Sequence, residues 1–119
     1  MADMTSEERE IAYQERESHA RYEYAVAQII QAKREGWTEL DLSDLRLPKL
    51  PPIIRHLTKL QSLSLNNNGL VAVPDFLRKL KQLQFLNFGS NMLTAVPDWL
   101  GELASLQFQP FNNPSKLLT

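Results

Sequence analysis

Residues able to do acid–base or metal chemistry are few in this chain and widely separated. The chain has two histidines, His19 and His56, and no cysteine. The histidines lack the close spacing of metal ligands, and the missing cysteines exclude a disulfide, a thiolate zinc site and a thiol nucleophile. The glycines are too scattered to form a phosphate-binding loop, at Gly36, Gly69, Gly89 and Gly101. We therefore expect no catalytic site, no metal and no cofactor.

One acidic group is concentrated enough to consider separately. Glu39, Asp41 and Asp44 lie close together in the sequence. Such carboxylates could hold a cation or act as an acid–base pair. We favour the two simpler interpretations, which are contact with a basic partner and solvation of an edge.

Composition narrows the class of protein. A chain of 119 residues with 43% hydrophobic and 23% charged residues is typical of one soluble globular domain. The formal net charge of −1 creates no field that would favour nucleic acid or an anionic membrane. No apolar stretch approaches the roughly 18 residues of a membrane span, and no signal-peptide pattern begins the chain. We expect a cytoplasmic protein, with export without a cleaved signal left open.

Residues 1–36 are expected to form an N-terminal helical cap. Thr5 and Glu8 have the spacing of a capping box, and Gly36 follows Lys33 and Arg34 as a helix end. The first half is less apolar, and a separate or frayed helix is an open alternative there. Helical spacing relates the apolar residues Ile11, Tyr22, Ala25, Val26, Ile29, Ile30 and Ala32.

From Trp37 onward the sequence repeats. Leu40, Leu63 and Leu86 are 23 residues apart. The same interval relates Leu42, Leu65 and Phe88; Leu60, Leu83 and Leu106; Pro51, Pro74 and Pro97; and Leu57, Leu80 and Leu103. A fixed period of this length is the signature of a stacked-repeat architecture.

These copies resemble leucine-rich repeats of the pattern LxxLxLxxNxLxxLPxxLxxL, from residue 37 to about 113. This intracellular kind is found in Ras-suppressor-like scaffolds, plant repeat proteins and bacterial effectors. The resemblance implies an α/β solenoid with a short parallel sheet on the concave face and short helical turns on the convex face. We divide the chain into a cap (1–36), about four repeats (37–113, the last degenerate) and a tail (114–119).

The alternation in each repeat predicts which residues point inward. The expected strands are Glu39–Leu42, Ser62–Leu65, Phe85–Phe88 and Phe108–Phe111. Asn68 and Asn91 should be buried and bond backbone groups of the neighbouring coil. Pro74-Asp75 and Pro97-Asp98 should start the helical turns, with each aspartate capping exposed amides.

The concave face is the expected binding surface. Phe85 and Phe108 occupy the same place in a 23-residue register, so their rings should lie on adjacent strands as apolar anchors. The alternative is that the two rings only cover each other and the open end. The full set of expected partner-binding residues is Glu39, Asp41, Asp44, Ser62, Ser64, Asn66, Phe85, Asn87 and Phe108.

A basic patch is predicted on the convex side. It consists of Arg55, His56, Lys59, Arg78, Lys79 and Lys81. We interpret it as a solvated surface, because it lacks the aromatic residues and motifs of nucleic-acid binding.

The predicted function is a non-catalytic protein–protein interaction module. One alternative is a structural solenoid that self-associates as a homo-oligomer through its open C-terminal end. A second is the recognition part of a larger enzyme, such as a bacterial effector.

Overall fold

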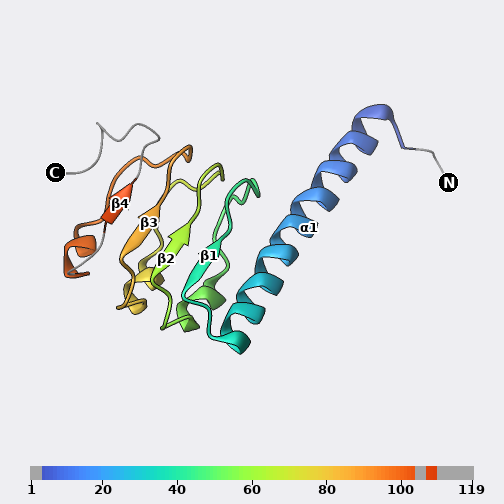
Figure 1. The fold of residues 1–119 in the computed structure, drawn as a ribbon. Coiled ribbons are helices and arrows are strands. Elements are labelled where there is room, and N and C mark those ends of the chain that lie inside the picture. Colours follow the sequence, from blue (N-terminus) through green and yellow to red (C-terminus); the bar gives the residue numbers. More distant parts are fainter. Residues whose placement is uncertain (1–3, 104–106, 110–119) are drawn as a thin grey trace.

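The computed structural model describes residues 4–103 and 107–109, which form one long helix, a four-stranded parallel sheet and three 3-10 helices (Figure 1). The long helix α1 spans Ser6–Glu35. The strands are β1 (Glu39–Asp41), β2 (Ser62–Ser64), β3 (Phe85–Asn87) and β4 (Gln107–Gln109). The 3-10 helices, η1 (Pro52–His56), η2 (Asp75–Lys79) and η3 (Asp98–Glu102), alternate with the strands.

Both ends of α1 lie where the sequence predicts them. The Thr5 hydroxyl accepts a hydrogen bond from the Glu8 amide (3.0 Å), and the Glu8 carboxylate accepts one from the Thr5 amide (3.3 Å). At the other end Gly36 has a φ of 66°, and its amide donates to the Ala32 carbonyl. This left-handed conformation costs glycine little. One continuous helix covers all 30 residues, so the open alternative of a separate helix in the first half does not hold.

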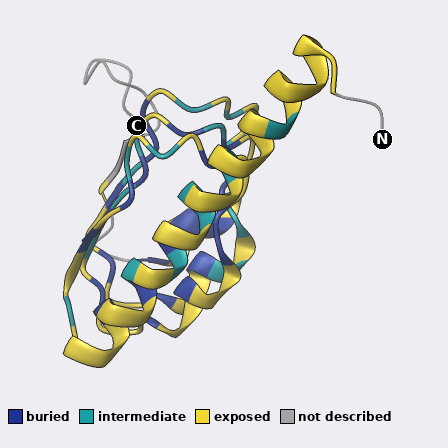
Figure 2. Ribbon diagram, turned by 90° about the vertical axis from the view of Figure 1, so that its right-hand side faces the viewer, coloured by how far each residue is buried: buried dark blue, intermediate teal, exposed yellow. Residues whose placement is uncertain are grey.

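Only the second half of α1 enters the core. Ala25, Ile29 and Ala32 are buried, and Tyr22 packs beside them. Ile11 was predicted on the same buried face, but it is 52% exposed. The physical reason is visible in Figure 1, where the first half of the helix leans away from the sheet. Figure 2 shows α1 exposed along most of its length.

The four strands follow each other in sequence order, and all neighbouring pairs are parallel. Leu40, Leu63 and Leu86 are paired across β1, β2 and β3 and are buried. The residues on either side of each leucine in the strand are not buried, as the alternation predicts. The buried core behind the sheet includes Leu42, Leu47, Leu60, Leu65, Leu70, Leu77, Leu80, Leu83 and Phe88.

The last strand departs from the 23-residue register. Phe108 pairs with Leu86, and Gln107 pairs with Phe85. The predicted alignment of Phe108 with Phe85 is therefore wrong by one residue. The observed pairing places an aromatic residue in line with the leucine column, where the 23-residue interval would have placed Gln109. A parallel strand that continues a buried column favours the register with an apolar residue there.

The predicted last strand, Phe108–Phe111, is accordingly observed as Gln107–Gln109. Pro110 and Phe111 lie outside the described residues, as does the tail at 114–119.

The helical turns are confirmed as 3-10 helices, with Leu77 and Leu100 buried. The predicted capping role of Asp75 is wrong, because its side chain makes no capping hydrogen bond in η2. It accepts a hydrogen bond from the indole nitrogen of Trp99 instead (3.0 Å). Trp99 is only 9% exposed, so its N–H needs this partner.

Candidate functional site

Asn68 lies inside the core and joins two successive repeats (called coils below) by hydrogen bonds. It is 7% exposed. Its Nδ2 donates to the carbonyls of Leu42 and Leu65, both at 3.0 Å. Its Oδ1 accepts from the amides of Leu45 (3.2 Å) and Leu47 (3.0 Å). The predicted ladder position is confirmed, and it rigidly joins the loops that follow β1 and β2.

Asn91 repeats this arrangement one coil further on, but it is half-buried and not buried as the sequence predicts. Its Nδ2 donates to the carbonyls of Leu65 (2.7 Å), Phe88 (3.0 Å) and Gly89 (3.2 Å). Its Oδ1 accepts from the Leu70 amide at 3.0 Å. Two rungs of the predicted ladder are thus present, and they fix the backbone at the ends of β2 and β3.

The residues before the two ladder asparagines, and Asp44 at the equivalent place in the first repeat, have a left-handed backbone. Asp44, Asn67 and Ser90 have φ values of 61°, 57° and 55°. The Asn67 side-chain amide also donates to the Asp44 carboxylate at 2.6 Å. Asn67 therefore joins the loop after β2 to the loop after β1. Asparagine and aspartate tolerate this conformation better than most residues, because their short side chains can hydrogen-bond locally.

We expect Asn67→Ala to lower the free energy of unfolding by about 1 kcal/mol, because alanine disfavours positive φ and loses the bond to Asp44. Asn67→Gly should cost less, because glycine adopts this backbone freely. Urea denaturation of both variants checks the expectation. An alanine variant as stable as the original chain would contradict it.

The exposed side of the sheet brings most of the predicted binding residues together. Phe85 is 48% exposed, and its backbone lies between Ser62 on β2 and Gln107 on β4. The backbone of Phe108 pairs with Leu86 and not with Phe85. We define the sheet face as the outward residues Glu39, Asp41, Ser62, Ser64, Phe85, Asn87 and Gln107.

Several polar residues of this region also build the loops beside it. The Oδ1 atoms of Asn66 (3.0 Å) and Asn87 (2.9 Å) both accept from the Gly89 amide. Asp41 accepts hydrogen bonds from the amide and hydroxyl of Ser43. These side chains are positioned before any partner arrives, which reduces the conformational entropy that binding would cost.

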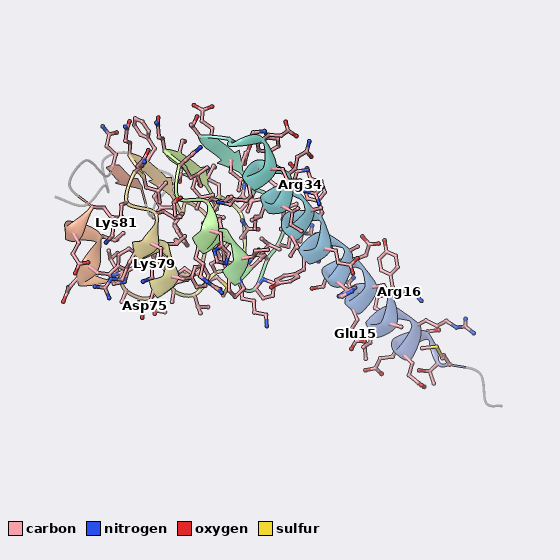
Figure 3. All side chains as sticks on the ribbon, turned by 90° about the horizontal axis from the view of Figure 1, so that it is seen from below. Glu15, Arg16, Arg34, Asp75, Lys79 and Lys81 are labelled. Carbon is pink, nitrogen blue, oxygen red and sulfur yellow. The ribbon has the colours of Figure 1, made fainter. Side chains whose placement is uncertain are left out.

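The predicted basic patch is partly neutralised. Arg78 forms an ion pair with Glu102 at 3.0 Å, and the Arg55 guanidinium donates to the Pro52 carbonyl at 3.2 Å. Lys79 and Lys81 remain on the outside of the molecule (Figure 3).

The two histidines lie far apart in the chain, with His19 against Glu23 on α1 (2.9 Å) and His56 exposed on η1.

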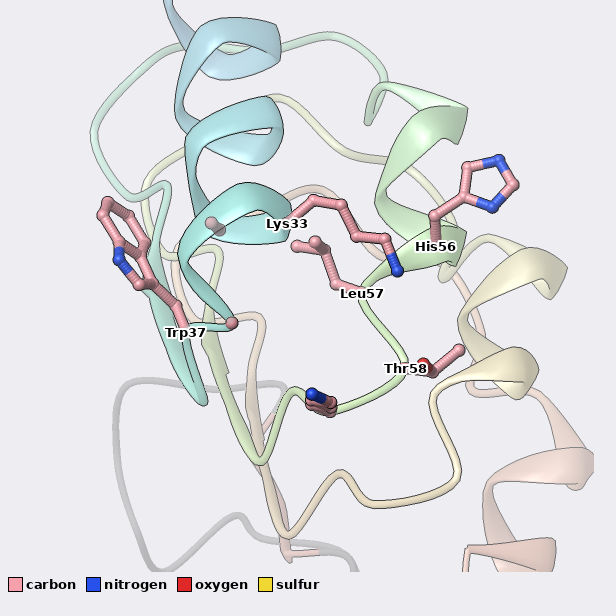
Figure 4. A pocket seen from close by; sticks show the side chains of 8 residues that line it. Lys33, Trp37, His56, Leu57 and Thr58 are labelled. Atoms are coloured by element: carbon pink, nitrogen blue, oxygen red, sulfur yellow. The ribbon is translucent and has the colours of Figure 1, made fainter.

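Sequence reasoning missed a hollow between α1 and η1. Lys33, predicted only as a favourable charge at a helix end, extends from α1 across this hollow toward Leu57 (Figure 4). An apolar groove next to it is formed by α1 and η1 together. We call it the α1–η1 groove, and it is lined by Ile29, Ile30, Lys33, Arg34, Ile53 and His56. No local pattern indicates that residues 29–34 and 53–56 lie together.

Within residues 4–103 and 107–109, no group of three or more His, Asp or Glu side chains is placed to hold a metal ion. None of the helices in that part of the chain has an apolar segment long enough to cross a bilayer.

Comparison with known proteins agrees with the architecture. A family model described as leucine rich repeat matches residues 58–108. A search of curated proteins finds no match to the chain. The matched segment contains β2, β3, both ladder asparagines and the two 3-10 helices η2 and η3. Residues 58–108 therefore belong to the leucine-rich repeat family.

Proposed function

We propose that this leucine-rich repeat protein is a non-catalytic module that binds a protein partner on its sheet face. The observation that carries the proposal is Phe85, a large ring 48% exposed between Ser62 and Gln107. An exposed aromatic side chain on a rigid, otherwise polar surface is the usual composition of a binding hot spot.

The acidic residues make the β1 end of the sheet face negatively charged. Glu39 and Asp41 lie on β1, and Asp44 follows in the loop. A partner that places an apolar group on Phe85 would present a basic group to β1. Charges of this kind mainly steer association and set its orientation.

The architecture we propose for this function is a solenoid whose concave side is the sheet face and whose N-terminal end is covered by α1. Ala25, Ile29 and Ala32 belong to the same buried cluster as the leucines of the repeats. A solenoid needs such a cover, because a terminal repeat cannot bury its own apolar side. The alternative is self-association through the C-terminal end. Most of the residues that it would involve lie outside the described part of the chain.

Phe85→Ala is expected to weaken partner binding by about 2 kcal/mol or more, while changing the melting temperature little. Partners should be captured with the original chain, identified, and then titrated with both forms. Met92→Ala is the matched control, because Met92 is also exposed (66%) but lies in a loop outside the sheet face. A large loss of stability in Phe85→Ala would assign the ring to the core and reject the proposal.

Reversing the charges of Glu39, Asp41 and Asp44 is expected to act on the rate of association. The association rate constant should fall, and its dependence on salt should flatten, because steering by these carboxylates is lost. Stopped-flow or surface-based kinetics at several salt concentrations measures both. An effect confined to dissociation would show that these residues make close contacts instead.

A further inference from the structure

The α1–η1 groove combines an apolar floor with cations that have no partner. Ile30 and Ile53 are 37% and 36% exposed on its surface. Among the described residues, no carboxylate pairs with Lys33 or Arg34. The groove therefore fits an occupant that is both apolar and acidic.

The carboxylate that follows Lys33 and Arg34 in the sequence has other hydrogen-bond partners. Glu35 is the only acidic residue in the last turn of α1. Its two carboxylate oxygens accept hydrogen bonds from Gln31 (2.6 Å) and from the indole of Trp37 (3.3 Å). Both oxygens of Glu35 are thus bound to these neighbours, and the carboxylate does not pair with the groove cations.

The first half of α1 has the opposite character. Residues 6–20 contain five glutamates and two arginines, and none of these 15 residues is buried. Ile11 and Tyr13 are 52% and 54% exposed. A helix of roughly 15 residues without tertiary contacts is marginal in water, so this segment would gain stability from a partner surface.

Both features lie on one side of the helix. Glu8, Glu15, Tyr22 and Ile29 follow each other at intervals of seven, which is two turns, and so form one stripe. Ile29 ends that stripe in the groove. Figure 3 shows Arg34 where α1 meets the repeats and Glu15 on the part that projects beyond them.

We propose that the occupant of the α1–η1 groove is the acidic first half of α1 from a second copy of this chain. In an antiparallel pair, residues 6–20 of each helix lie beside the second half of the other. Glu8 and Glu15 then approach Lys33 and Arg34, and Ile11 covers apolar surface of the groove. The same contact is made twice around a two-fold axis, so the assembly closes as a dimer.

Sedimentation equilibrium of the 119-residue chain tests the assembly directly. We expect a monomer–dimer equilibrium between about 1 µM and about 1 mM that weakens as salt is added, because ion pairs contribute to it. A chain that stays monomeric at every concentration would leave the groove to another occupant and overturn the proposal. Phe85→Ala should not alter the equilibrium, since the sheet face takes no part.

Two charge reversals give a sharper test. Glu8→Lys/Glu15→Lys and Lys33→Glu/Arg34→Glu should each weaken homodimer formation about tenfold or more, because like charges meet. An equimolar mixture of the two variants should dimerise again, since every contact then joins opposite charges. A mixture that remains monomeric while the original chain dimerises would reject this pairing of helix halves.

Glu10→Lys/Glu17→Lys is the matched control. It changes the same charge at the same spacing, two residues further along the helix and therefore on its other side. Its dimerisation should follow that of the original chain. Circular dichroism checks that all variants keep the helix, and equal losses in the control and in Glu8→Lys/Glu15→Lys would attribute the effect to net charge and contradict the proposal.

Discussion

Deletion of residues 1–36 is expected to abolish cooperative folding of the remaining chain. Ala25, Ile29 and Ala32 lie in the same buried cluster as Leu40 and Leu42 of the first repeat, so removing α1 exposes that end of the core to water. Each large apolar side chain left exposed costs roughly 1.5–3 kcal/mol, and a small domain has only about 5–15 kcal/mol to lose. The deleted chain should aggregate or lose its sigmoidal urea transition.

Deletion of residues 1–20 is the control for this prediction. None of the described residues in that segment is buried, so the shorter deletion should change the free energy of unfolding by less than about 1 kcal/mol at low protein concentration. A second variant, Ala25→Glu, tests the covering role without shortening the chain, because Ala25 is 0% exposed. A soluble fragment 37–119 with a cooperative transition would show that α1 is an appendage.

The second large effect is expected at Asn68. Asn68→Ala leaves the carbonyls of Leu42 and Leu65 and the amides of Leu45 and Leu47 without their side-chain partner. Each buried group without a hydrogen bond costs about 1–3 kcal/mol, so the loss of stability should reach about 3 kcal/mol or more. Urea denaturation with a fixed slope measures it.

Asn67→Ala is the neighbouring control for the ladder. Its expected loss of about 1 kcal/mol comes from a positive φ and one exposed hydrogen bond. Asn68→Asp keeps the acceptor and loses the Nδ2 donor, so it should also destabilise the chain. Equal losses for Asn67→Ala and Asn68→Ala would mean that the asparagine ladder does not stabilise these coils.

Several features were determined by the sequence itself. The 23-residue interval aligned Leu40, Leu63 and Leu86, and the resemblance to leucine-rich repeats implied a parallel sheet; both agree with the structure. The ladder role of Asn68 and both ends of α1 were also predicted correctly. These features depend on local spacing, on capping chemistry or on a period that is repeated several times. Each of these can be read from the order of residues without knowing which distant segments come into contact.

Other features were decided only by contacts between distant segments. In the degenerate last repeat Gln109 stands where the other repeats have their first strand leucine, so the position of Phe108 followed from pairing with β3. The partner of Asp75 is Trp99, 24 residues away, and capping rules that consider one helix alone cannot find it.

The helix α1 shows most clearly which features the sequence predicts and which depend on packing. Its apolar residues are sparse before Tyr22 and dense from Tyr22 to Ala32, and their helical spacing predicts one apolar side. Only the tertiary structure decides how much of that side is covered, because the repeats reach no further than its second half. The same geometry brings Ile53 and His56 of η1 beside Lys33 and creates the α1–η1 groove, since packing, unlike periodicity, depends on what lies opposite.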